Sequence, residues 1–180
     1  MAADKRDTEW KLVEQCLQGD HSAFEEIYKM LSPKMYTVSL RYTQSDFDAQ
    51  DVLQDAFIRI YNNLKQFKFN GSFEGWCRRI VMNTAIESLR KKGRMKENSS
   101  EDMPEIAIEP KSFERLKYED LMKLIRTLPD GYRSVFNLYV IDGYSHKEIG
   151  ELLGVTESTS KTQLFKARLA LQKKVNATLG

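Results

Sequence analysis

The chain is poor in the residues that mark secreted or membrane proteins. It contains only two cysteines, Cys16 and Cys77, which lie far apart with no second thiol near either, so no disulfide framework is indicated. No stretch approaches the roughly 20 consecutive apolar residues of a membrane-spanning helix. The first residues, MAADKRDTEW, lack the apolar core of a signal peptide. We therefore expect a cytoplasmic protein without membrane insertion.

Residue patterns for catalysis are also missing. The two histidines, His21 and His146, are isolated, and the sequence has no metal-ligand cluster, no phosphate-cradling glycine loop and no nucleophile with a neighbouring base. We predict a protein that is not an enzyme and needs no metal or cofactor. Cys77, beside Trp76, is interpreted as a small buried hydrophobic side chain. His146, near a helix start, is interpreted as a surface residue.

The composition is that of an ordinary helical protein, with 41% hydrophobic and 30% charged residues. The formal net charge of +2 is too small to indicate a nucleic-acid partner by itself. The distribution of charge is more informative, because residues 156–180 carry Glu157 as their one acid. The basic residues of the same segment are Lys161, Lys166, Arg168, Lys173 and Lys174.

The stretch 145–168, SHKEIGELLGVTESTSKTQLFKAR, has the pattern of two helices joined by a tight turn. Ser145 and Thr156 suit the two N-caps, and Gly154 suits the left-handed turn after the first helix. On the second helix one stripe is expected to pack inward: Ser160, Leu164, Ala167 and Leu171. The outward residues are short, polar or basic: Ser158, Lys161, Thr162, Phe165, Lys166 and Arg168. This face suits the major groove of DNA, although a helical hairpin of this kind is often only a solvated helix pair.

The first 92 residues predict four helices. We expect one from about residue 8 to residue 17, a second from Asp20 that breaks or restarts at Pro33, and a third from about Ser45. In the third helix the core-facing stripe is Leu53, Phe57, Ile60 and Leu64. The acids Asp48, Asp51 and Asp55 fall off this stripe, beside Ile58 and Tyr61. Such a face suits a protein partner, and a solvated acidic face is an equally good explanation.

An aromatic loop, FKFNGSF (67–73), precedes the fourth helix. Phe73 and Trp76 of that helix are expected in the core, whereas Phe69, Asn70 and Ser72 lie at the loop tip. A second stripe of the helix is polar and positive: Arg79, Asn83 and Arg90. Rings beside cations and amides suit single-stranded nucleic acid, because bases stack on rings and phosphates pair with cations.

Residues 93–111 lose the helical pattern, contain Pro104 and Pro110, and indicate an acidic linker. Beyond it, apolar residues at helical spacing from Phe113 to Leu128 end at Pro129, and a further helix stops at Asp142–Gly143. The sequence therefore predicts an all-α fold. It consists of two small helical domains, 1–92 and 112–180, joined by a flexible linker at 93–111, and the C-terminal domain contains a helix-turn-helix.

Three segments in this order resemble the extracytoplasmic-function (ECF) group of bacterial RNA polymerase sigma factors. The third helix, DAQDVLQDAFIRIYNNLKQF, is similar to the family's polymerase-binding helix, and FNGSFEGWCRRIVMNTAIESLRKK resembles its promoter-melting segment. The C-terminal module from LPDGYRSVF to FKARLAL resembles the module that reads the upstream promoter element. The resemblance covers nearly the whole chain.

The resemblance implies a role for each part. The third helix would bind the clamp helices of the largest subunit of core RNA polymerase through Asp51, Gln54 and Asp55, and the flap region is a second expected contact. The loop would capture a flipped base of the downstream promoter element with Phe67, Lys68, Phe69, Asn70 and Ser72, beside Arg79, Asn83 and Arg90. The upstream element would be read in promoter DNA by Ser158, Lys161, Gln163, Phe165, Lys166 and Arg168. The linker acids would face the RNA path, and an anti-sigma factor is an expected partner.

Two positions depart from the usual family pattern. Ser160 stands where an aliphatic residue commonly packs, and Gln163 where an arginine is common; the loop sequence also differs. The upstream preference and the flipped base are therefore left open. The alternatives to a sigma factor are a free-standing helix-turn-helix regulator and, less well supported, a protein-interaction decoy.

Overall fold

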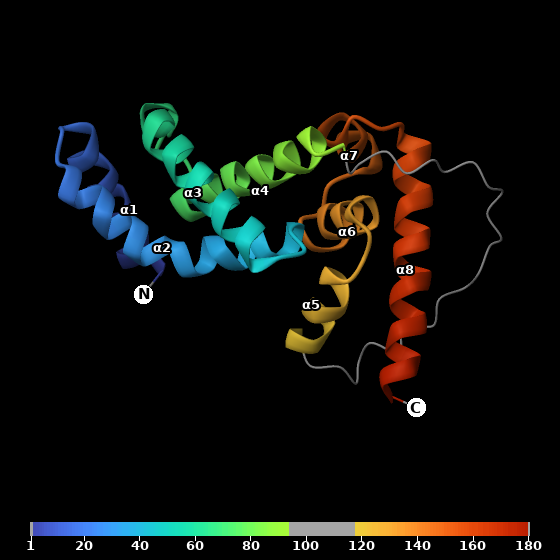
Figure 1. Cartoon of the computed structure of the whole chain (residues 1–180). Coiled ribbons are helices and arrows are strands. Elements are labelled where there is room, and N and C mark those ends of the chain that lie inside the picture. The colour runs from blue at the N-terminus through green and yellow to red at the C-terminus, as the bar shows by residue number, and fades with distance from the viewer. Residues whose placement is uncertain (1, 94–117, 180) are drawn as a thin grey trace. The chain divides into compact units, whose positions relative to one another are not determined.

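A computed structural model of the chain describes residues 2–93 and 118–179 (Figure 1). Helices form its regular secondary structure, and no strand occurs in these two ranges. Contacts divide the chain into two compact units, one of residues 1–40 and 45–85 and the other of residues 41–44 and 86–180. Residues 94–111 of the linker predicted at 93–111, and the predicted helical residues 113–117, lie outside the described ranges.

The N-terminal helices are α1 (Ala2–Leu17), α2 (His21–Tyr42), α3 (Asp46–Asn63) and α4 (Phe73–Lys91), with a short 3-10 turn, η1 (Leu64–Gln66), after α3. Their apolar stripes meet in one core. Its fully buried side chains include Val13, Ile27, Leu31, Met35, Ile60 and Phe73. The third helix begins where the sequence predicts, and Ser45 caps it, since the Ser45 hydroxyl accepts a hydrogen bond from the Asp48 backbone N–H at 3.0 Å.

Two predictions about helix ends in this unit are wrong. The first helix begins at Ala2 instead of near residue 8. The second does not break at Pro33 but runs without interruption to Tyr42. Proline removes one backbone donor from a helix, but Ile27, Leu31 and Met35 are fully buried on either side of it. Tertiary packing of this stripe holds the helix together across the missing bond.

The C-terminal helices are α5 (Tyr118–Arg126), α6 (Asp130–Phe136), α7 (His146–Leu153) and α8 (Glu157–Leu179). A π-helical segment, η3 (Asn137–Ile141), continues α6 and ends before Gly143, which has a φ of 76°. The core includes Leu128, Leu138, Ile149 and Leu171. It also contains the side chain of Arg133, whose guanidinium pairs with Asp130 and donates to the Leu128 carbonyl oxygen at 2.8 Å.

None of the helices in the described ranges is both long enough and apolar enough to cross a membrane.

Candidate nucleic-acid and polymerase interfaces

The helix-turn-helix has the local geometry that the sequence predicts. Ser145 and Glu148 form a reciprocal capping box at the start of α7, where the Glu148 carboxylate accepts from the Ser145 N–H at 2.8 Å. Gly154 ends α7 in the left-handed region, with φ 71°. The Thr156 hydroxyl then accepts from the Thr159 N–H at 3.0 Å and caps α8. The two caps and the left-handed turn at Gly154 define the local geometry of the helix-turn-helix.

The outer face of α8 carries exposed Ser158, Lys161 and Arg168, with half-buried Phe165 and Lys166 beside them. The Lys161 ammonium lies 2.7 Å from a carboxylate oxygen of Glu157, one turn away. On the opposite face Ser160, Leu164, Ala167 and Leu171 are buried, which confirms the predicted inward stripe. The exposed side of α8 is therefore polar and basic, as major-groove recognition requires.

Gln163 lies outside this exposed face. Its side chain is 1% exposed and faces α6, where a Cβ built on Gly131 would lie 3.0 Å from the Gln163 amide nitrogen. Neither of its amide atoms has a hydrogen-bond partner among the described residues. Because α8 packs against both α6 and α7, its buried sector is wider than one apolar stripe. A direct DNA contact for Gln163 does not fit this burial.

His146 makes a contact between helices that the sequence analysis missed. It is not a free surface residue: its Nδ1 atom lies 2.9 Å from the hydroxyl oxygen of Ser160, and its ring stacks on Tyr139 with a centroid distance of 4.5 Å. Ser160 is fully buried on α8. Partial burial, with Lys161 and Arg168 nearby, lowers the pKa of His146, so the neutral ring is favoured. A hydrogen bond between His146 of α7 and Ser160 of α8 is therefore present at the position where an aliphatic side chain commonly packs in the family.

The aromatic loop at 67–72 is held by rings from three parts of the chain. Phe67 is 5% exposed and contacts Phe69, Phe73 and Trp76, with centroid distances of 5.1, 5.1 and 5.8 Å. Phe69 is half-buried and has a φ of 53°, which is unusual for a bulky residue. Lys68, Asn70 and Ser72 are exposed. Phe67 therefore lies in the floor of the loop, while Asn70 and part of Phe69 present a surface.

The predicted positive stripe of α4 is accessible. Arg79, Asn83 and Arg90 are all exposed. At 100° per residue they fall within one narrow sector of the helix. A strand that leaves the loop could follow this sector with its phosphates.

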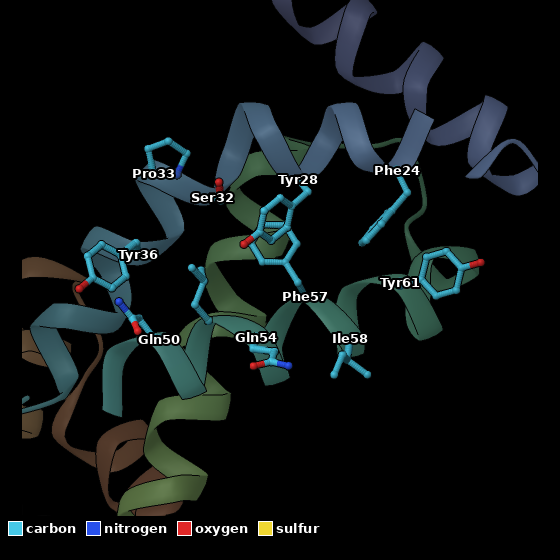
Figure 2. A pocket seen from close by; sticks show the side chains of 11 residues that line it. Phe24, Tyr28, Ser32, Pro33, Tyr36, Gln50, Gln54, Phe57, Ile58 and Tyr61 are labelled. Atoms are coloured by element: carbon cyan, nitrogen blue, oxygen red, sulfur yellow. The ribbon is translucent and has the colours of Figure 1, made fainter. Parts of the chain in front are cut away.

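The outer face of α3 combines acids with apolar side chains. Asp51, Gln54 and Asp55 are exposed, and so are Phe47 (72%), Ile58 (53%) and Tyr61. A groove of about 850 Å³ runs between α2 and α3. Figure 2 shows Phe24 and Tyr28 of α2 facing Phe57 and Tyr61 of α3, with Gln54 and Ile58 along the edge. An exposed apolar groove whose lining includes the amides of Gln50 and Gln54 is typical of a protein-binding surface.

Among the described residues no group of His, Cys, Asp and Glu side chains is arranged to hold a metal ion. Cys77 is fully buried, as predicted, and this burial raises the pKa of its thiol well above the usual value. Cys77 is therefore a packing residue rather than a reactive thiol.

A capped helix-turn-helix whose second helix has a polar, basic outer face indicates the class of helical DNA-binding proteins. The chain matches Sigma-70 region 2 over residues 27–95 and Sigma-70 region 4 over residues 118–171. It is 32% identical to ECF RNA polymerase sigma factor SigW of Bacillus subtilis (strain 168), an alignment that covers 92% of this chain and 95% of the relative. It is 33% identical to the ECF RNA polymerase sigma-E factor of Escherichia coli (strain K12), over 93% and 94% of the two chains.

A solved structure of CnrH in complex with the cytosolic domain of CnrY has the same fold. Its TM-score is 0.51 at 22% identity, and the match covers 94% of this chain and 98% of that chain. This chain belongs to the ECF family of RNA polymerase sigma factors. It is a transcription initiation factor, in a family that is not enzymatic, and the expectation of a sigma factor over a free-standing regulator is confirmed.

Proposed function

We propose that this sigma factor divides promoter recognition between its two domains, 1–92 and 112–180, as a cytoplasmic subunit with no catalytic activity of its own. The matches to region 2 at 27–95 and region 4 at 118–171 support the division. The single observation that carries the proposal is the pairing, in one chain, of a capped helix-turn-helix with an aromatic loop whose tip is exposed.

The upstream element is read as duplex by α8. Ser158 lies in the first turn, where a short hydroxyl can reach a base edge, and Lys161, Lys166 and Arg168 supply charge for phosphates. Phe165, half-buried, offers an apolar edge to a thymine methyl group. Gln163 is left out of this contact set and supports α8 from within.

The downstream element is opened at the loop. Unpairing and extruding a base costs a few kcal/mol, and stacking on an aromatic side chain returns roughly 1–3 kcal/mol per base. Phe69 offers the ring and Asn70 an amide, with Lys68 and Ser72 beside them and Phe67 as the floor. Arg79, Asn83 and Arg90 hold the neighbouring phosphates, so that the opened strand is kept from re-pairing.

Core polymerase is bound by α3. Its clamp helices would contact Asp51, Gln54 and Asp55, which are exposed on the helix that forms one side of the apolar groove, and the flap region would hold the C-terminal domain. The same groove suits an anti-sigma factor, which would regulate the protein by competing for the polymerase face. The linker acids Glu97, Glu101, Asp102, Glu105 and Glu109 would face the RNA path.

The deciding experiment is run-off transcription with bacterial core polymerase on a pool of genomic promoter fragments, followed by sequencing of the transcripts. We expect discrete start sites that require the protein and share two upstream sequence elements. If the protein binds duplex DNA alone but adds no start sites to core polymerase, the proposed division of labour is wrong.

A further inference from the structure

The loop that presents Phe69 is fixed at both ends by hydrogen bonds, one between backbone groups and one from a backbone N–H to a side-chain hydroxyl. At the first end the Phe67 N–H donates to the Leu64 carbonyl oxygen at 3.1 Å. At the other end the Ser72 hydroxyl accepts from the Gly75 N–H at 3.0 Å, which starts α4. Phe69 lies between these two anchors with its backbone in the left-handed region, φ 53°. A bulky residue occupies that region at a cost, so its surroundings must hold it there.

Trp10, on α1, is one of the residues that keep Phe69 in this conformation. Its ring meets the ring of Phe69 at a centroid distance of 5.7 Å and an angle of 89°, an edge-to-face contact. On the other side Phe69 contacts Phe67 at 5.1 Å. The ring of Phe69 is therefore held between α1 and the floor of the loop. Such pairs contribute beyond the area that they bury, because the positive edge of one ring meets the negative face of the other.

We propose that Trp10 is a positioning residue for base capture: through Phe69 it fixes the loop in the conformation that receives the flipped base. The inference rests on the proposed function of the loop. Trp10 touches no promoter base in this scheme. It fixes the ring of Phe69, and the direction of the adjacent Asn70 follows from the backbone of Phe69.

The position of Trp10 on α1 separates this role from general packing. Val13 of α1 is fully buried in the core, whereas Trp10 is half-buried beside the loop. A loop already in its receiving conformation loses less conformational entropy when a base enters. Loss of the Trp10 contact should therefore slow promoter opening while leaving polymerase binding unchanged.

The test uses the full chain with core polymerase and a duplex promoter taken from the run-off experiment. 2-Aminopurine replaces successive bases of its downstream element, and its fluorescence rises when the base leaves the stack. We expect Trp10→Leu to slow this rise by about two- to tenfold, the factor that corresponds to one aromatic pair. Affinity for core polymerase should be unchanged. Trp10→Tyr keeps a ring and should restore most of the rate.

A double-mutant cycle shows whether Trp10 acts through Phe69. In a chain that already carries Phe69→Leu, adding Trp10→Leu should slow opening no further, because the effects of substituting two coupled residues do not add. Leu12→Ala is the matched control: it alters a half-buried residue of the same helix, two positions from Trp10 and so on another side. Opening by this variant should match that of the natural chain.

The outcomes separate the two proposals. If Phe69→Leu slows opening and Trp10→Leu does not, the role of Trp10 is refuted while base capture stands. If neither slows opening, base capture itself is refuted. Equal slowing by Leu12→Ala, or additive effects in the cycle, would assign Trp10 to general packing and overturn the inference. If Trp10→Leu fails to fold, the rate of promoter opening is measured for Trp10→Tyr instead. If Trp10→Tyr slows opening as much as Phe69→Leu does, the proposed role of Trp10 is overturned.

Discussion

The hydrogen bond between His146 and Ser160 makes a quantitative prediction about the helix-turn-helix. Ser160 is fully buried, whereas His146 is half-buried and water can reach its ring. Removing one partner of a buried hydrogen bond costs about 1–3 kcal/mol, because the other is left unsatisfied. His146→Leu leaves the Ser160 hydroxyl with the Thr156 carbonyl as its alternative acceptor, one turn earlier. We therefore expect His146→Leu to lower the stability of the helix-turn-helix by about 1–2 kcal/mol, the lower part of that range.

Substitution of Ser160, the other partner of the hydrogen bond, should destabilise the helix-turn-helix less. Ser160→Val leaves the polar atom on His146, where water can satisfy it, and adds apolar area to the core. We expect a cost below about 1 kcal/mol. The double variant should be more stable than the sum of the two single effects, because neither partner then remains buried and unpaired. The lost stacking on Tyr139 is common to His146→Leu and the double variant, so it cancels in the cycle.

The suitable assay is hydrogen exchange of the amides in α7 and α8, which reports local opening of this unit. It should be measured for the natural chain and the three variants at one pH near neutral. Strictly additive free energies of opening would show that the two side chains are not coupled. A larger cost for Ser160→Val than for His146→Leu would refute the argument from burial.

Three further predictions concern charge. Since the pKa of His146 is lowered in the folded chain, protonation favours the unfolded state. The stability of the helix-turn-helix should therefore be full above about pH 6.5 and fall as the pH drops below it; urea titrations of the natural chain and His146→Leu should differ in this slope. Lys161→Ala should weaken promoter binding similarly for all sequences and reduce the salt dependence by about one phosphate contact in filter binding; an altered sequence preference would argue against a phosphate role. Asp51→Ala should lower affinity for core polymerase with the melting temperature unchanged, and unaltered binding in a pull-down would refute the proposed contact of Asp51.

The sequence predicts best the features that depend on neighbouring residues. Ser145, Gly154 and Thr156 are local signals, and the caps and the turn of the helix-turn-helix lie where they indicate. The exposed acids Asp51 and Asp55 follow from the helical period, because a stripe of apolar residues leaves the other faces to water.

Features set by packing between distant segments escaped the sequence analysis. Gln163 is buried because α8 packs against more than one helix, and a single stripe on a helical wheel cannot show this. His146 pairs with a serine fourteen positions away, and Phe69 with a tryptophan on α1. Pro33 is a helix breaker by propensity, yet it lies within α2 because the buried residues on both sides favour one continuous helix.

The ring cluster around the loop also gives the protein an optical property. Its two tryptophans, Trp10 and Trp76, both contact this cluster, at Phe69 and at Phe67 and Phe73. A base that stacks on Phe69 would enter the immediate surroundings of an indole ring. The natural fluorescence of the chain therefore reports on the loop without any label, and emission changes on adding single-stranded promoter fragments would follow occupancy in real time.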